Sequence, residues 1–281
     1  MTRPSITLCA DDYGLAPGVG RAIRTLIEAG RLQATGCMTG SPFWSEEAQL
    51  LKPLEGRAEI GVHLTLTDHQ PLGAMPSLAP DGRLPSIGAL LKRAMLRSLD
   101  RAEIAAELER QVDAFETAMG RRPDFLDGHH HVHQLPVIRD AVLDLAHRRL
   151  APGKGWVRNC WDNPLMILRR GVDPIRAVII ALLGWRFRRS LLDEAIPTNG
   201  GFRGVYDFSG RVPYAELFRR FTQAPGPATL MMCHPGEVDE PLRACEWLTD
   251  QREVEYRFLA SDACPFSLAD RGLTFAPLPR G

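Results

Sequence analysis

The amino-acid sequence predicts an α/β fold whose strands are mainly parallel. Short apolar runs alternate with segments of helical periodicity along the 281 residues. Such alternation is typical of parallel strands joined by right-handed crossovers. About seven such units follow one another, which suits a barrel or an open sheet. No internal repeat or Gly/Ser-rich linker interrupts them, so we expect a single domain over residues 1–281.

The first half of the chain has the clearest alternation. The expected strands are residues 5–10, 34–39, 58–62 and 123–126. The expected helices are residues 17–29, 45–51 and 100–119. In the last helix apolar residues recur every three or four positions, Asp100 is placed to cap the first turn, and Gly120 ends it. A loop rich in Pro and Gly is expected between Gln70 and Gly88.

The second half keeps this pattern except in one segment. Strands are expected at residues 155–159 and 228–233, and helices at 137–150, 212–221 and 250–259. Residues 163–197 are helical and basic and break the rhythm, so we expect an insertion or a cap. Their apolar run, Ala177 to Gly184, is too short to span a bilayer, and we interpret it as a buried helical segment.

The overall composition is that of a soluble globular protein. Hydrophobic residues make up 44% and charged residues 24%, and 34 basic residues balance 34 acidic ones. This balance argues against nucleic acid as a partner. Between Arg139 and Leu191, however, eleven basic residues face four acidic ones. This segment predicts a solvated basic face or, alternatively, a surface that meets an anionic substrate or membrane.

Cysteine usage and the N-terminus favour a cytoplasmic protein. The six cysteines include no C-x-x-C pair, and Cys9, Cys37 and Cys233 lie in apolar runs typical of buried positions. The first residues lead directly into a strand, without the apolar region of a signal peptide. We therefore expect a reducing compartment and no disulfide framework.

Titratable side chains follow four of the expected strands at their C-terminal ends. These side chains are Asp11 and Asp12, His63, Asp127 with His129, and His234. Because such strand ends converge on one face of a parallel α/β fold, we expect these residues to build one site.

The segment Asp127-Gly128-His129-His130-His131-Val132-His133 is the densest of these groups. Neutral imidazole suits zinc and other divalent first-row metals. If the segment is extended, His129, His131 and His133 share a face and His130 points away. If it is helical, His129 and His133 pair instead. Both arrangements leave at least one histidine outside a metal's coordination shell.

One carboxylate with two histidines is typical of a hydrolytic metal site that keeps positions open for water. A second carboxylate could then take the water's proton, and a histidine across the site could protonate a leaving amine. Two other classes remain open. His131-Val132-His133 also suits a dinuclear amidohydrolase or phosphoesterase, and a non-catalytic metal- or sugar-binding module is the third class. The second acid, Asp11, has no evident task in such a module.

Four motifs together resemble the YdjC-like carbohydrate deacetylases, which include chitooligosaccharide deacetylases and hopanoid-biosynthesis-associated members. The motifs are Ala10-Asp11-Asp12-Tyr13-Gly14, Gly61-Val62-His63-Leu64, residues 127–133, and His234-Pro235-Gly236. The resemblance implies a distorted (β/α) barrel and one divalent metal ion, magnesium or zinc. It also implies hydrolysis of an N-acetyl group on an amino sugar, either in an oligosaccharide or linked to a lipid.

The resemblance also assigns roles by position. It implies that Asp12, His63 and His129 hold the metal, with His133 as the alternative to His129. Asp11 would be the general base and His234 the general acid. The residues expected to line the site or orient its ligands are His131, His133, Asp127, Asn199 and Phe202. Tyr13 is a departure, because Phe is frequent at this position. Membrane contact and a homodimer are further expectations.

Overall fold

The computed structural model describes residues 4–279 and contains one curved sheet in which every strand pairing is parallel. The strand order is β5-β4-β3-β2-β1-β7-β6, with β8 beside β1. The strands are β1 (Ser5–Tyr13), β2 (Ala34–Cys37), β3 (Glu59–Leu64), β4 (Phe125–Gly128), β5 (Trp156–Val157), β6 (Gly201–Arg203), β7 (Thr229–Cys233) and β8 (Thr274–Phe275).

The two edges of the sheet approach each other, which makes the fold a distorted barrel. A parallel bridge joins Val157 in β5 to Thr198, three residues before β6. The side chain of Thr198 reinforces this contact, because its hydroxyl donates a hydrogen bond to the Val157 carbonyl. The expected fold class is therefore confirmed.

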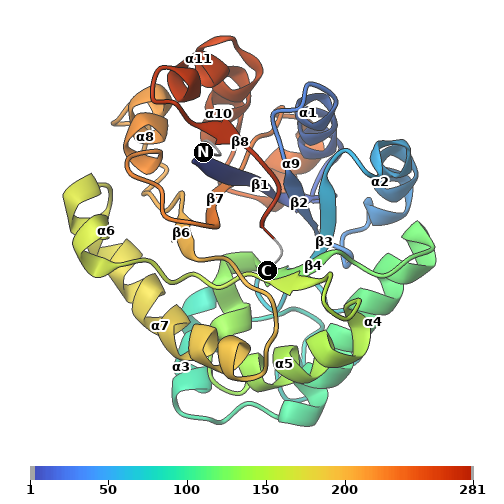
Figure 1. Ribbon diagram of the computed structural model, residues 1–281. Coiled ribbons are helices and arrows are strands. Elements are labelled where there is room, and N and C mark those ends of the chain that lie inside the picture. Colours follow the sequence, from blue (N-terminus) through green and yellow to red (C-terminus); the bar gives the residue numbers. More distant parts are fainter. Residues whose placement is uncertain (1–3, 280–281) are drawn as a thin grey trace.

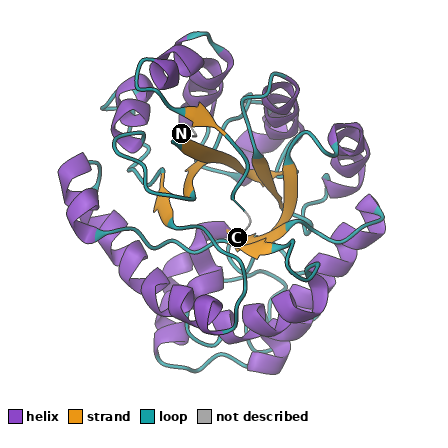
Figure 2. Ribbon diagram, viewed as in Figure 1, coloured by secondary structure: helices purple, strands orange, loops and turns teal. Residues whose placement is uncertain are grey.

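Helices ring the outside of this sheet (Figures 1 and 2). They are α1 (Pro17–Glu28), α2 (Trp44–Leu51), α3 (Ile87–Met95), α4 (Arg101–Met119), α5 (Ile138–Arg149), α6 (Pro164–Arg170), α7 (Pro174–Asp193), α8 (Tyr214–Phe221), α9 (Glu240–Cys245), α10 (Asp250–Ala260) and α11 (Ala263–Ala269). Two short 3-10 helices are η1 (Lys52–Leu54) and η2 (His129–Gln134). Among the described residues, no helix is both long and apolar enough to cross a membrane.

The ends of α4 follow the predicted signals. The Asp100 carboxylate accepts hydrogen bonds from the backbone N–H groups of Ala102 and Glu103, so it caps the first turn. Gly120 ends the helix with φ of 75°, a left-handed conformation that glycine adopts without steric cost. These local contacts fix the ends of a 19-residue helix on the outside of β3.

Alternating side chains of the strands fill two apolar layers. Ile6, Leu8 and Ala10 of β1 pack toward the helices, whereas Cys9 packs inside the curved sheet with Phe125 and Trp156. The Phe125 and Trp156 rings stack with their centroids 4.2 Å apart. Because side chains of a strand alternate, the inward direction of Cys9 also brings Asp11, two residues later, inside the barrel.

Two parts of the prediction need correction. The region after Gln70 is a loop, but α3 begins at its end, and the short elements β6, β8, α9 and α11 were not predicted. The apolar run Ala177–Gly184 is helical, as expected, but only part of it is buried: Ala181 and Gly184 face the interior. Ile179 and Leu182 face solvent, because this side of α7 lies on the outside of the molecule, whereas α6 and η2 pack against the helix elsewhere.

Candidate active site

A hollow of about 620 Å³ opens at the C-terminal ends of the strands. Six of the expected site residues line it: Asp11, Asp12, His63, His129, His131 and His234. Apolar side chains of α3 and α7 form other parts of its wall, among them Ile87, Leu91, Ile180 and Leu183. The strand-end pattern therefore marks one shared site, as expected for parallel strands.

A bulge in β1 allows two neighbouring carboxylates to reach this hollow. The pairing of β1 with β2 shifts between Ala10 and Tyr13, and Asp12 has φ of 67°. A left-handed conformation is uncommon for a residue other than glycine and is often found at functional sites. The bulge breaks the simple alternation of side chains, so Asp11 and Asp12 both line the same cavity.

Asp12, His63 and His129 form a compact, buried group whose ligand atoms lie within 4.8 Å of one another. The Asp12 Oδ1 atom is 3.3 Å from His63 Nε2 and 3.0 Å from His129 Nδ1. One carboxylate oxygen and two imidazole nitrogens are a donor set that suits a divalent metal ion. The group contains His129 and not His133.

The His63 ring is held in the orientation that a metal ligand needs. Its Nδ1–H donates a hydrogen bond to Asp127 Oδ1 at 2.7 Å, which leaves Nε2 toward Asp12. This carboxylate–histidine pair is the usual support of a ligating imidazole. Burial opposes protonation of the ring, but the Asp127 and Asp11 carboxylates raise the pKa of His63 to about 10. The residues present therefore fit a metal ion in this position.

Arg158 binds the second carboxylate of the bulge. Its guanidinium donates hydrogen bonds to both Asp11 oxygens, at 2.6 and 2.7 Å, and lies 2.7 Å from Asp127 Oδ2. Burial opposes ionisation of Asp11, yet Arg158 and His63 hold the pKa of this carboxyl below its usual range. Arg158 was not singled out from the sequence; it lies within the expected strand 155–159 and directly follows β5 in the structure.

Arg252 of α10 donates a hydrogen bond at 2.7 Å to Asp12 Oδ2, the oxygen that does not face the histidines. Burial opposes ionisation of Asp12, but Arg252 and His129 keep the pKa of its carboxyl well below the ordinary value. No pattern in the sequence connects these two residues, which lie 240 positions apart.

His234 lies across the hollow, with its Nε2 atom 3.9 Å from Asp11 Oδ2. Burial lowers the pKa of His234 to about 4, so its ring is neutral near pH 7. Its backbone N–H donates a 2.7 Å hydrogen bond to Glu255, which also accepts one from the Tyr206 hydroxyl at 2.5 Å. Burial raises the pKa of Glu255 to about 7. Glu255 and Tyr206 were not predicted from the sequence.

The histidine cluster is neither an extended strand nor a regular helix. His130 and His131 have φ of 52° and 59° within η2, so the chain turns sharply there. His130 and His131 line the hollow, and the His130 ring bonds the Thr67 hydroxyl at 2.9 Å. His133 is fully buried behind the site, where its Nε2–H donates to the Arg158 carbonyl. His69, which sequence reasoning missed, also lines the hollow, and its ring lies edge-on to His129.

The remaining expected residues lie beneath or beside the hollow. Asp127 supports His63, as described above. Asn199 bonds the backbone of Asn159 and joins the two edges of the barrel. Phe202 lies under Arg158, with the guanidinium carbon 5.8 Å from the ring centroid. Close to them in the chain, Val205 and Tyr206 line the hollow.

Comparisons with known proteins agree with this architecture. The sequence profile of the family described as YdjC-like protein matches residues 5–270. The chain belongs to the YdjC-like family. A chitooligosaccharide deacetylase of Yersinia pestis is 38% identical to it over 265 residues, which cover 94% of this chain and 93% of the relative. The chitooligosaccharide deacetylase of Serratia marcescens is 29% identical over 266 residues, with the same coverage.

A solved structure supports the YdjC-like fold. It is a crystal structure from Enterococcus faecalis V583 whose name proposes cellobiose-phosphate cleavage. It superposes with a TM-score of 0.75, covers 98% of both chains, and is 20% identical. At this identity the likeness concerns the fold.

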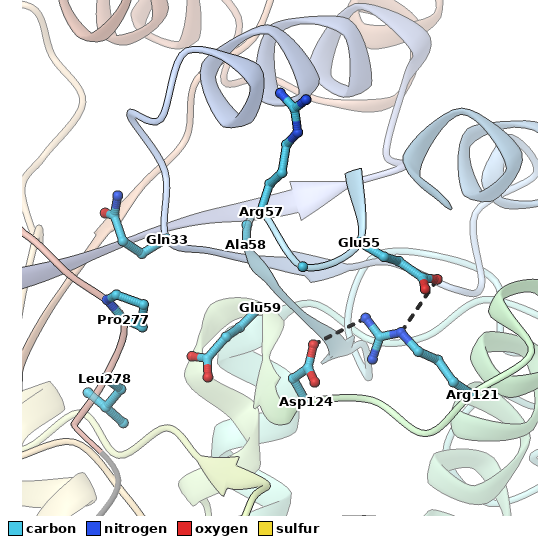
Figure 3. A pocket seen from close by; sticks show the side chains of 10 residues that line it. Gln33, Glu55, Arg57, Ala58, Glu59, Arg121, Asp124, Pro277 and Leu278 are labelled. Atoms are coloured by element: carbon cyan, nitrogen blue, oxygen red, sulfur yellow. Dashed lines mark hydrogen bonds and ion pairs between the residues drawn. The ribbon is translucent and has the colours of Figure 1, made fainter. Parts of the chain in front are cut away.

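This YdjC-like chain has a second hollow, of about 610 Å³, at the opposite end of the sheet (Figure 3). Its charged side chains largely satisfy one another. Arg121 lies between Glu55, at 3.5 Å, and Asp124, at 3.1 Å. Glu59 accepts a hydrogen bond from the Trp156 indole. Among the described residues, no histidine or cysteine lines this hollow.

Proposed function

We propose that this YdjC-like protein is a metal-dependent carbohydrate deacetylase that hydrolyses the N-acetyl group of an amino sugar. The observation that carries the proposal is the pairing of two acids with different partners. Asp12 belongs to a group of metal-ligand type, whereas Asp11 lies beside this group and bonds Arg158 instead. An acid next to a metal site, and not part of it, suits a general base.

The metal, when bound, would activate water and polarise the acetyl carbonyl. Asp12, His63 and His129 would hold it, and Asp127 would keep the His63 ring in place. Asp11 accepts the proton of the attacking water. Arg158 holds both oxygens of Asp11, so the carboxylate is ionised and fixed in direction before substrate arrives.

His234 is proposed to protonate the leaving amine nitrogen when the C–N bond breaks. Its ring is neutral at rest, because its pKa lies near 4. The proton that it donates must therefore reach it during turnover. Asp11 Oδ2, 3.9 Å away, offers such a source after it has taken the proton from water. The products are acetate and a free amine.

A dinuclear hydrolase is the rival enzyme class. A second group with metal-ligand geometry does exist, formed by Cys9, Asp11 and Asp127. The guanidinium of Arg158 fills it, with contacts to all three side chains. A built-in cation at this position supports a site with one metal rather than two. His133, half of the His-x-His pair, bonds backbone and lies outside both groups.

The deciding experiment is an acetate-release assay on N-acetylated mono- and oligosaccharides. Metal-stripped protein should be inactive, and magnesium or zinc added singly should restore activity with one equivalent bound per chain. Two tightly bound equivalents would favour the dinuclear class. Metal binding without release of acetate from any acetylated sugar would favour a binding module.

A cytoplasmic location belongs to the same proposal. Five of the six cysteines are buried, and all six lack a disulfide partner. Free buried thiols are typical of proteins from a reducing compartment.

A further inference from the structure

The outer face of α7 carries an unusual number of exposed apolar side chains. Ile175 is 76% exposed, Leu182 57% and Trp185 42%. Leu165 and Leu168 of the neighbouring α6 are also exposed. We call these residues, together with Ile179 and Leu192, the α6–α7 face; it lies on the outer rim of the ring in Figure 1. An exposed apolar patch of this kind on a surface helix is typical of a site that contacts a membrane or another protein.

Exposed arginines also lie on the α6–α7 face. Arg186 and Arg189 lie on the same side of α7, one and two turns beyond Leu182, and Arg169 lies in the last turn of α6. All three are exposed, and none forms an ion pair with another residue between positions 4 and 279. The Arg189 guanidinium lies over the Trp185 ring at 5.4 Å. Apolar side chains with unpaired arginines are typical of helices that lie in the interface of an anionic bilayer.

The α6–α7 face is continuous with the mouth of the active-site hollow. Ile179 belongs to both, and Ile180 and Leu183 form the inner wall behind it. Other parts of the same wall contain two further exposed apolar residues, Ile87 at 36% and Trp247 at 73%. A membrane or protein bound to the α6–α7 face would therefore lie directly beside the mouth of the active-site hollow.

We propose that the α6–α7 face docks on the surface of an anionic phospholipid bilayer. The apolar side chains enter the boundary between head groups and acyl chains, and the arginines contact lipid phosphates. A second copy of the chain is the poorer occupant, because a two-fold contact of this face with itself would bring arginine against arginine. Docking goes beyond the proposed hydrolysis and does not depend on it.

Co-sedimentation with vesicles tests the proposal. One set of vesicles is phosphatidylcholine, and the other is an equal mixture of phosphatidylcholine and phosphatidylglycerol. We expect at least about tenfold stronger partitioning to the anionic set, with the difference reduced at high salt. Ile175→Ser with Leu182→Ser should weaken binding to anionic vesicles by about tenfold, and Arg186→Glu with Arg189→Glu should abolish the preference for them.

Matched controls carry the same chemical changes elsewhere. Leu50→Ser with Phe266→Ser removes apolar side chains of similar exposure, 52% and 73%, from α2 and α11. Arg57→Glu with Arg122→Glu reverses two exposed charges near the opposite end of the sheet. Both controls should bind vesicles like the parent protein, and thermal unfolding should confirm that all four variants fold.

Several results would overturn the proposal. Equal sedimentation with both vesicle sets would remove the anionic bilayer as the occupant. Equal losses of vesicle binding in the test variants and the control variants would also remove it. If light scattering found a dimer that the α7 variants dissociate, while none of the proteins sedimented with vesicles, the face would be a contact between copies of this chain.

Discussion

Asp127 accepts a hydrogen bond from the Nδ1–H of His63 at 2.7 Å, and His63 Nε2 is thereby directed toward Asp12. The same Asp127 lies 2.7 Å from Arg158 through its other oxygen. One carboxylate thus orients the histidine that we propose as a metal ligand and contacts the arginine that holds Asp11. Asp127 therefore connects the surroundings of Asp11 and Asp12, while Arg252 holds Asp12 separately.

Asp127→Asn should weaken metal binding by about 10- to 100-fold, because the His63 ring loses its charged partner. Isothermal titration of metal-stripped protein measures the change. Asp124→Asn is the matched control, since Asp124 precedes the same strand but faces the opposite end of the sheet. An unchanged dissociation constant in Asp127→Asn would contradict the supporting role.

Asp11→Asn should keep the metal and lose turnover by about 10²- to 10⁴-fold, as expected when a general base is removed. Metal content and acetate release are measured on the same preparation. Asp12→Asn provides the contrast, because it should lower metal content as well. Wild-type turnover in Asp11→Asn would exclude this residue as the base.

Metal binding should release a proton and strengthen as pH rises. The pKa of His63 is about 10 in the metal-free protein, so its Nε2 carries a proton that a metal must displace. With one proton released, affinity should increase by about tenfold per pH unit below this pKa. Titrations in buffers of different ionisation enthalpy count the proton. An affinity independent of pH between 6 and 8 would contradict the prediction.

Glu255→Gln should make stability less dependent on pH. The pKa of Glu255 is raised from an ordinary 4.5 to about 7, so the folded state holds this proton more tightly than the unfolded state. Its contribution to stability is complete below pH 4.5 and is lost as pH rises through 7, by up to about 3 kcal/mol. Urea unfolding of both proteins at pH 5 and pH 8 measures the effect. The prediction would be contradicted if the free energy of unfolding changed equally with pH in the two proteins.

Gly61→Ala should destabilise the fold by about 1–3 kcal/mol. A Cβ atom at Gly61 would come within 2.5 to 2.6 Å of the Phe125 ring, which is held by its stack on Trp156. Gly88→Ala is the control, because a Cβ there meets nothing within 4 Å and position 88 lies in α3. Chemical denaturation compares the two. Equal stabilities would contradict the packing argument.

The sequence predicts which residues lie at the strand ends of this site, but it does not predict how their side chains are arranged. A titratable residue after each apolar run is a local signal, so Asp11, His63 and His234 could be found without a structure. The bulge that turns Asp12 into the same cavity is set by the register of β1 against β2, which no local pattern reports. Arg252 reaches Asp12 from α10 for the same reason: only the closed sheet brings them together.

Two other features show where local reasoning fails. The left-handed turn at His130 and His131 makes both periodic interpretations of the cluster inapplicable. The apolar run in α7 resembles a core helix in composition, yet the place of this helix on the outside of the molecule leaves Ile179 and Leu182 in solvent. Composition indicates that a segment is apolar enough to be buried. Whether other parts of the chain cover it depends on the packing of the whole fold.

Arg158 gives this site a permanent counter-ion. Three buried carboxylates, Asp11, Asp12 and Asp127, meet two buried guanidiniums, from Arg158 and Arg252. Most of the acidic charge is therefore balanced by covalently attached cations that no chelator can extract. We therefore expect the barrel to assemble without a bound metal ion. If the proposed metal is required for turnover, its supply would control the activity of the enzyme but not its folding.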